Sequence, residues 1–225
     1  MRYSIEGGSL PAVVIQLNPG ESILSEAGGR TWMKGNVETS TNAEGGFGKS
    51  IGRLFSGESL FMTRYTARGP AEIGFASSFP GKILAVELQP GQSIICQKSA
   101  VLCGAGNLNL SIHFKKKIGA GLFGGEGFIM QKVTGPGIAF LELDGYCKEY
   151  ILGPGERLTC DTGVLAVMDE TCSMDVVMVK GAKNIFFGGE GHLDTVVTGP
   201  GKVCLQTMTI PHLAGLIAPY LATKE

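Results

Sequence analysis

Short apolar runs separated by Pro-Gly and Gly-Pro pairs dominate the hydrophobic pattern of this chain. Some runs alternate between apolar and polar positions and others are apolar throughout, and both patterns are typical of β-strands. Proline fixes φ at the second position of a turn and glycine tolerates a positive φ at the third, so each Pro-Gly pair predicts a type II turn. We therefore expect an all-β protein. The predicted strands are Ala12–Leu17, Ser22–Leu24, Leu60–Tyr65, Ile83–Leu88, Ser93–Cys96, Asn107–His113, Phe128–Val133, Ile138–Leu143, Glu149–Leu152, Arg157–Cys160, Met174–Val179, Leu193–Thr198 and Lys202–Met208.

The turns recur in a fixed order, so that one unit is written three times. A Pro-Gly marker (LNPGE, LQPGQ, LGPGE) is followed in each copy by a Gly-Glu marker and then by a Gly-Pro marker, and the third copy repeats the second at an offset of 64 residues. This period exceeds that of ordinary solenoid repeats, so each copy is predicted to be a small subdomain of a single all-β domain. The domain spans residues 1–225, with copies at about 12–80, 83–145 and 149–208 and a C-terminal segment at 209–225.

Both ends of the repeat array carry further signals. Strand Ala12–Leu17 precedes the first Pro-Gly marker, whereas the last copy ends at Met208 without the strand that follows the others. We hypothesise that the N-terminal strand completes the third copy and closes a pseudo-threefold ring, which would remove open sheet edges. The apolar segment Pro211–Leu221 predicts a short helix with proline in its first turn, packed on its own sheet or on a neighbouring subunit. Between the first and second markers, Asn36–Gly52 is predicted to be a long loop.

Composition excludes some partners. The formal net charge is −1, so no global field attracts nucleic acid or anionic membranes. Charged residues make up 17% of the chain, a low share that favours extensive burial, including burial in an oligomer interface. The N-terminus lacks the apolar region of a signal peptide, and no apolar run reaches membrane-helix length. With six cysteines and no export signal, we expect a cytoplasmic protein.

Local motifs for catalysis, cofactors or metals are absent from the sequence. No CxxC occurs, no histidine stands at zinc-ligand spacing, and Cys96 and Cys160 align with Ser25 at an expected inward position for small side chains. The GxGxxG match Gly119–Gly124 is followed by a β-rich run, so it predicts a turn and no nucleotide site. The recurring glutamates have two interpretations, a cation site on a threefold axis or turn carboxylates, and we favour the second. These glutamates are Glu58, Glu126 and Glu190.

One basic cluster is a candidate contact for nucleic acid or another ligand. It consists of Lys115, Lys116, Lys117 and Lys132, and aromatic residues lie near it in sequence. Stacking aromatics combined with phosphate-binding cations are the usual means of holding single-stranded RNA. The alternative is an edge strand that lysines keep from pairing with other strands.

The spaced markers LxPGE, F-(G/S)-G-E-(G/S) and TGPG resemble, over nearly the whole chain, the family named for altered inheritance of mitochondria, protein twenty-four, a domain of unknown function. The resemblance implies a fold similar to the tryptophan RNA-binding attenuation protein: three tandem double-stranded β-helix-like or sandwich repeats in a pseudo-threefold arrangement. It brings no catalytic or cofactor residues, and it implies a link to mitochondrial biogenesis in eukaryotic members. This chain looks like a prokaryotic, cytoplasmic relative. We expect a non-enzymatic structural or interaction protein that self-assembles as a homo-oligomer; the alternative is a binding module for RNA or a small ligand.

Overall fold

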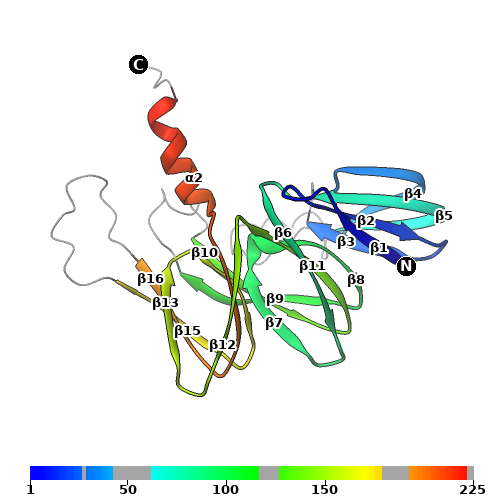
Figure 1. The fold of residues 1–225 in the computed structure, drawn as a ribbon. Coiled ribbons are helices and arrows are strands. Elements are labelled where there is room, and N and C mark those ends of the chain that lie inside the picture. The colour runs from blue at the N-terminus through cyan, green and yellow to red at the C-terminus, as the bar shows by residue number, and fades with distance from the viewer. Residues whose placement is uncertain (27–28, 43–61, 117–126, 179–192, 222–225) are drawn as a thin grey trace, which may run out of the picture.

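The computed structural model describes residues 1–26, 29–42, 62–116, 127–178 and 193–221. Within these ranges the protein is built from β-strands, and one short helix, α2 (Ile210–Ile217), stands at the C-terminal end (Figure 1). The all-β prediction and the C-terminal helix are therefore confirmed. The strands of the first segment are β1 (Arg2–Glu6), β2 (Ala12–Leu17), β3 (Ser22–Glu26), β4 (Trp32–Asn42) and β5 (Met62–Ala76).

Two further segments follow, each with six strands. The second comprises β6 (Gly81–Leu88), β7 (Ser93–Gln97), β8 (Val101–Gly106), β9 (Asn109–Lys116), β10 (Phe128–Thr134) and β11 (Gly137–Asp144), with the 3-10 turn η1 (Lys98–Ala100) before β8. The third comprises β12 (Cys147–Leu152), β13 (Arg157–Asp161), β14 (Leu165–Asp169), β15 (Ser173–Met178), β16 (Leu193–Thr198) and β17 (Gly201–Gln206). Every strand predicted in the described ranges is found, with small shifts at the ends.

Strand pairing follows one scheme inside the segments. In the second segment β11 lies between β6 and β8, and β10 lies between β7 and β9. In the third segment β17 lies between β12 and β14, and β16 lies between β13 and β15. In the first segment the long strand β5 replaces both central strands, because β2 and β3 pair along one of its edges and β4 pairs along the other. A pseudo-threefold arrangement of the segments stays a prediction.

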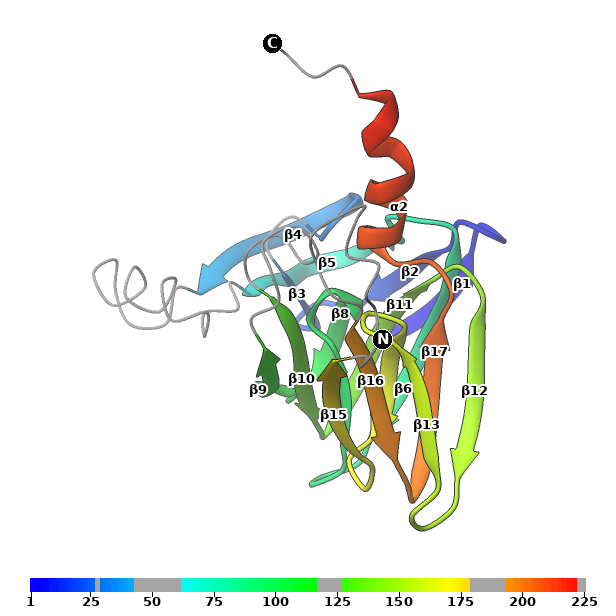
Figure 2. The same ribbon diagram turned by 90° about the vertical axis from the view of Figure 1, so that its left-hand side faces the viewer.

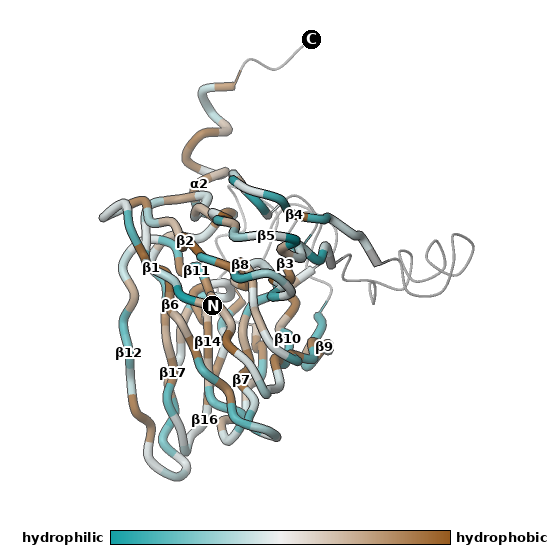
Figure 3. The backbone as a smooth tube through the Cα atoms, turned by 90° about the vertical axis from the view of Figure 1, so that its right-hand side faces the viewer, coloured by the Kyte–Doolittle hydropathy of each residue, from teal (hydrophilic) through white to brown (hydrophobic). Residues whose placement is uncertain are grey.

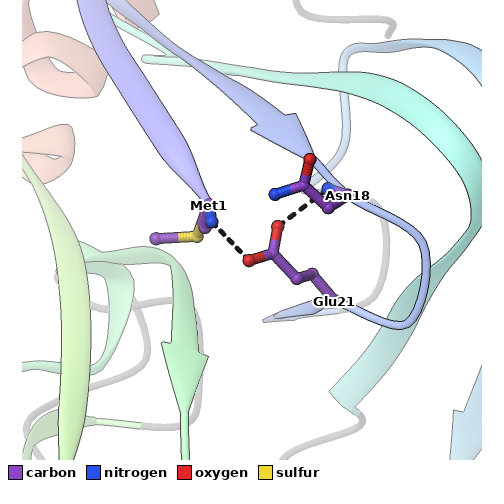
Figure 4. Close-up of polar contacts among 3 residues, drawn as sticks. All are labelled: Met1, Asn18 and Glu21. Atoms are coloured by element: carbon purple, nitrogen blue, oxygen red, sulfur yellow. Dashed lines mark hydrogen bonds and ion pairs between the residues drawn. The ribbon is translucent and has the colours of Figure 1, made fainter.

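The Pro-Gly markers are hydrogen-bonded turns. Their glycines have positive φ angles of 88°, 80° and 75°, which glycine adopts without the steric cost of a Cβ atom. In each marker the side chain after glycine accepts a hydrogen bond of 2.8 Å from the backbone amide three residues earlier. Figure 4 shows the first case, in which the other oxygen of the Glu21 carboxylate pairs with the Met1 amine. The three acceptor and donor pairs are Glu21 with Asn18, Gln92 with Gln89 and Glu156 with Gly153.

Sheets run from one segment into the next. Strand β3 of the first segment pairs with β8 of the second, and β7 of the second pairs with β14 of the third. The N-terminal strand β2 pairs with β1 and β5, so it completes the first segment. The hypothesis that Ala12–Leu17 completes the third segment and closes a ring is therefore wrong. Among the described residues no strand of the third segment pairs with a strand of the first, and in Figure 1 the first segment lies on the right and the third on the left.

Three hydrophobic clusters fill the spaces between the sheets. The first joins the first segment to β8 and β11, the second joins the second segment to β14 and β17, and the third joins β7 and β10 to the third segment. Strand β11 contributes to two clusters, with Phe140 on one face and Leu141 on the other. Since both faces of this strand are buried, its apolar run is almost continuous, as is typical of a central strand.

A buried amide network also connects the second and third segments. The Gln97 Nε2 atom donates to the backbone oxygens of Gly163 at 2.7 Å and Leu165 at 2.6 Å. Gln206 Nε2 donates to the Gln97 Oε1 atom at 3.3 Å and to the Gly163 oxygen at 3.0 Å, while its own oxygen accepts from the Asp144 amide at 3.1 Å. The network fixes the β13–β14 turn against the second segment.

The predictions about buried positions and about the long loop were confirmed in part. Ser25 and Cys96 are fully buried at the expected inward position, and Cys160 at the same position is half-buried. Strand Met174–Val179 was predicted to be buried, but most of β15 is exposed. The predicted loop Asn36–Gly52 is wrong over its first part, because β4 continues to Asn42; its remainder lies outside the described residues.

Candidate functional site

The predicted basic cluster does not form one patch in the described structure. Lys115 and Lys116 are neighbours in β9, so their side chains point to opposite faces of the sheet. The Lys116 amine donates to the backbone oxygen of Val176 in the third segment, and the Lys132 amine forms an ion pair with Glu170. Two of the four lysines therefore hold the second segment against the third. Lys117 lies outside the described residues.

The Gly-Glu markers also lie outside the described residues, as does the GxGxxG match. The prediction about Glu58, Glu126 and Glu190, whether turn carboxylates or a cation site, therefore stays a prediction.

Among the described residues, seven strands pair with only one other strand, namely β1, β4, β6, β9, β12, β13 and β15. Two of these open edges, β13 and β4, belong to the third and the first segment. Strand β13 is one of the two outer strands of a three-stranded sheet and pairs with β16 alone. Strand β4 pairs with β5 alone, and its first residues Trp32 and Met33 are 37% and 39% exposed. Figure 2 brings β13 to the front of the molecule, while β4 extends along the first segment behind it. Unpaired N–H and C=O groups along such edges are ready sites for pairing with another strand.

Helix α2 is apolar and carries no buried residue. Thr209 caps its N-terminus by accepting a hydrogen bond of 3.3 Å from the His212 amide, and Pro211 stands in the first turn as predicted. Figure 3 shows the helix projecting from the β-sheet body, with hydrophobic residues along it. Of the two expected positions of this helix, packing on its own sheet is therefore wrong, and packing on a neighbouring subunit stays a prediction. The exposed apolar side chains of this helix and the turn after it are Ile210, Leu216, Ile217, Tyr220 and Leu221.

A group of potential metal ligands lies on strands β12 and β17, which run side by side (Figure 2). The sulfur atoms of Cys147 and Cys204 and a carboxylate oxygen of Glu149 all lie within 4.8 Å of one another. Glu149 pairs directly with Cys204 across the two strands, and Cys147, two residues before Glu149, points to the same face. Cys204 is 3% exposed, Cys147 is half-buried and Glu149 is exposed.

Electrostatics keeps these two thiols protonated at neutral pH. Burial, with smaller contributions from Cys147 and Glu149, raises the pKa of the Cys204 thiol to about 12. Burial also raises the pKa of Cys147, although Lys82 opposes the shift. The Lys202 amine, 2.8 Å from the Glu149 carboxylate, holds the pKa of that carboxyl below its ordinary value. Because a cysteine nucleophile needs a thiolate, these shifts disfavour nucleophilic attack by either residue.

Sequence spacing gave no sign of this group, because Cys147 and Cys204 stand 57 positions apart. A signal was nevertheless present, since both residues lie in or next to strands that were predicted as the first and last of one copy. Pairing of these two strands brings the three side chains together.

The chain is similar to known proteins over almost its whole length. The sequence profile described as Mitochondrial biogenesis AIM24 matches residues 3–208. An uncharacterised protein of Streptococcus pyogenes serotype M6 is 28% identical over 234 residues, which cover 100% of this chain and 93% of that protein. The X-ray crystal structure of a Streptococcus pyogenes protein matches with a TM-score of 0.78 and 25% identity, over 98% of this chain and 99% of the other. None of the described helices is long and apolar enough to cross a membrane.

Proposed function

This chain belongs to the mitochondrial biogenesis AIM24 family, and we propose that it is a non-enzymatic structural or interaction protein that assembles with further copies of itself. The assembly uses the open edges of β13 and β4, with helix α2 as an additional apolar contact. The observation that carries the proposal is the register of the two pairings that join successive segments.

These pairings connect equivalent positions, counted from the Pro-Gly and Gly-Pro markers. Ile23 pairs with Ala105 between the first and second segments, and Ile94 pairs with Asp169 between the second and third. The next strand in this series is β13, in which Leu158 occupies the position of Ile23 and Ile94, four residues after the marker proline. Its equivalent partner is Lys34, because Lys34 pairs with Glu72 in the first segment as Ala105 pairs with Ile138 in the second.

The third segment therefore carries an open strand, β13, and the first segment carries the strand that would be its equivalent partner, β4. These two strands lie at opposite ends of the molecule in Figure 1. Pairing β13 of one copy with β4 of the next is a head-to-tail contact, which produces a closed ring or an open filament according to the rotation between copies. A second copy of this chain fits because two segments of the same chain already use this pairing.

Helix α2 adds an apolar surface to such an assembly. Between Thr209 and Leu221 the only ionisable groups are His212 and Tyr220, so contact with a second apolar surface carries little charge-desolvation cost. Leu216 and Tyr220 are 59% and 87% exposed in the single chain.

Native mass spectrometry and light scattering over a range of protein concentrations test the proposal. We expect a discrete oligomer or a growing filament at high concentration. A strict monomer at every concentration would refute self-assembly.

Cysteine cross-linking tests the register itself. The series places Thr159 of one copy opposite Met33 of the next, so a mixture of the Met33→Cys and Thr159→Cys variants should form a heterodimeric disulfide under mild oxidation. A mixture of Met33→Cys with Tyr150→Cys is the matched control, because Tyr150 lies on the exposed strand β12, which the series does not pair with β4. Equal cross-linking in the two mixtures would contradict the head-to-tail register.

The alternative function is a binding module for RNA or a small ligand, and its RNA version receives less support from the described lysines, two of which contact the third segment. Binding of single-stranded RNA at low salt that is lost in a Lys115→Ala variant would restore it, since phosphate contacts give strongly salt-dependent affinity.

A further inference from the structure

We infer that Cys147, Cys204 and Glu149 form a binding site for a thiophilic divalent cation, Zn²⁺, on the edge of the sheet that ends at β12. The three ligand atoms already lie within 4.8 Å of one another. This inference does not depend on self-assembly, because all three residues belong to one copy of the chain.

The donor set selects the class of metal. Calcium and magnesium prefer oxygen ligands alone, whereas zinc takes cysteine sulfur at about 2.3 Å and carboxylate oxygen at about 2.0–2.2 Å. In a tetrahedral zinc site with these bond lengths, neighbouring ligand atoms lie about 3.5–3.8 Å apart. The exposed Glu149 side chain is free of packing constraints that would prevent a movement of about 1 Å to reach this geometry. Three protein ligands leave a fourth position for water.

Charge balance also fits a bound zinc ion. Binding displaces the two thiol protons into solvent, so two thiolates, one carboxylate and Zn²⁺ together carry a single negative charge. The Lys202 amine lies 2.8 Å from Glu149 Oε2, where it balances that charge and leaves the other carboxylate oxygen for the metal. Lys202 therefore acts as an outer partner that orients a ligand, as carboxylates and carbonyls do around metal-bound histidines.

The fold itself does not require these side chains. At the equivalent positions of the other two segments, counted from the Pro-Gly and Gly-Pro markers, every residue is apolar. Some of these residues are buried in the hydrophobic core and others are partly exposed. The ligand set is thus particular to the third segment. The equivalents of Cys147, Glu149 and Cys204 are Ile83, Ala85 and Phe140 in the second segment and Ala12, Val14 and Gly74 in the first.

Zinc titration of the full, reduced chain tests the inference. After treatment with a chelator, the protein is titrated with Zn²⁺ in competition with a chromophoric chelator, and Co²⁺ serves as a spectroscopic probe. We expect one Zn²⁺ per chain and a thiolate-to-cobalt charge-transfer band. Zn²⁺ should also raise the melting temperature, because a ligand that binds only the folded state stabilises it.

Variants separate a built site from adventitious binding. Cys147→Ser and Glu149→Gln should each weaken Zn²⁺ binding by about tenfold or more. Neither residue is fully buried, so both variants are expected to fold. Cys172→Ser is the matched control: it removes a thiol outside the group and retains a donor for the Pro200 oxygen. Absence of stoichiometric zinc, or equal affinity in Cys147→Ser and wild type, would overturn the inference.

Discussion

Replacing Gln97 with methionine tests whether the buried amide network stabilises the junction between the second and third segments. The substitution keeps side-chain length but removes three hydrogen bonds, two to backbone oxygens and one from Gln206. A typical net contribution is about 1 kcal/mol for each bond, which gives a loss of about 3 kcal/mol. Burial of additional apolar surface by methionine offsets about 1 kcal/mol of this loss. We expect a net destabilisation of about 2 kcal/mol.

Gln131 provides a matched control on the neighbouring strand β10. It is 1% exposed, against 8% for Gln97, so both side chains are buried. Its Nε2 atom donates one hydrogen bond of 3.0 Å to the Lys98 oxygen, and its Oε1 atom is buried with no partner among the described residues. Gln131→Met loses that single bond but also removes an unsatisfied polar atom, and these effects are of similar size and opposite sign. We expect it to stay within about 1 kcal/mol of wild type.

Thermal unfolding followed by circular dichroism, at one fixed protein concentration, measures both variants. For a protein of this size, each kcal/mol shifts the melting temperature by about 2–4 °C, so Gln97→Met should melt about 4–8 °C below wild type. Gln131→Met should melt close to wild type. Equal destabilisation by the two substitutions would show that side-chain packing, and not hydrogen-bond satisfaction, sets the cost, and would refute the reasoning.

Two further predictions concern single carboxylates. Glu156→Gln should melt like wild type, because Gln92 makes the same turn contact in the second segment, whereas Glu156→Ala should lose about 1 kcal/mol in thermal unfolding. Burial raises the pKa of Asp144 above its ordinary value of 3.8, so the folded state binds its proton more tightly than the unfolded state, and stability falls as pH rises between the two pKa values. Asp144→Asn should therefore melt above wild type at pH 7, and the difference should vanish below about pH 4; a difference that persists in acid would contradict this assignment.

The fold was largely predictable from sequence because its strongest signals are local. Pro-Gly turns fix both the direction of the chain and the backbone angles of the glycines, and they mark where strands begin and end. The recurrence of Glu or Gln after each Pro-Gly pair has a local cause as well, namely the hydrogen bond across the same turn. Such features depend on a few consecutive residues, which a single sequence displays in full.

Pairing between distant strands was less predictable. The ring hypothesis assigned Ala12–Leu17 to the third segment because a repeat count left that segment one strand short. In the structure β5 replaces two strands of the later segments, and its extra length provides the partner for β2. Register between non-consecutive strands depends on which faces become buried together, and alternation along one strand does not encode the partner.

The candidate site residues were less predictable than the strands, because their positions depend on side-chain direction and on strand pairing. The basic run in β9 predicts a patch, but alternation of side chains across a strand places Lys115 and Lys116 on opposite faces of the sheet. Conversely, Cys147 and Cys204 showed no ligand spacing, and only the antiparallel pairing of β12 with β17 unites them beside Glu149. Since the equivalent positions in the other segments are apolar, packing alone does not call for a carboxylate and two thiols there. In a chain that repeats its architecture, the position where one copy has cysteine and glutamate in place of apolar residues is the place where chemistry specific to that copy should be sought.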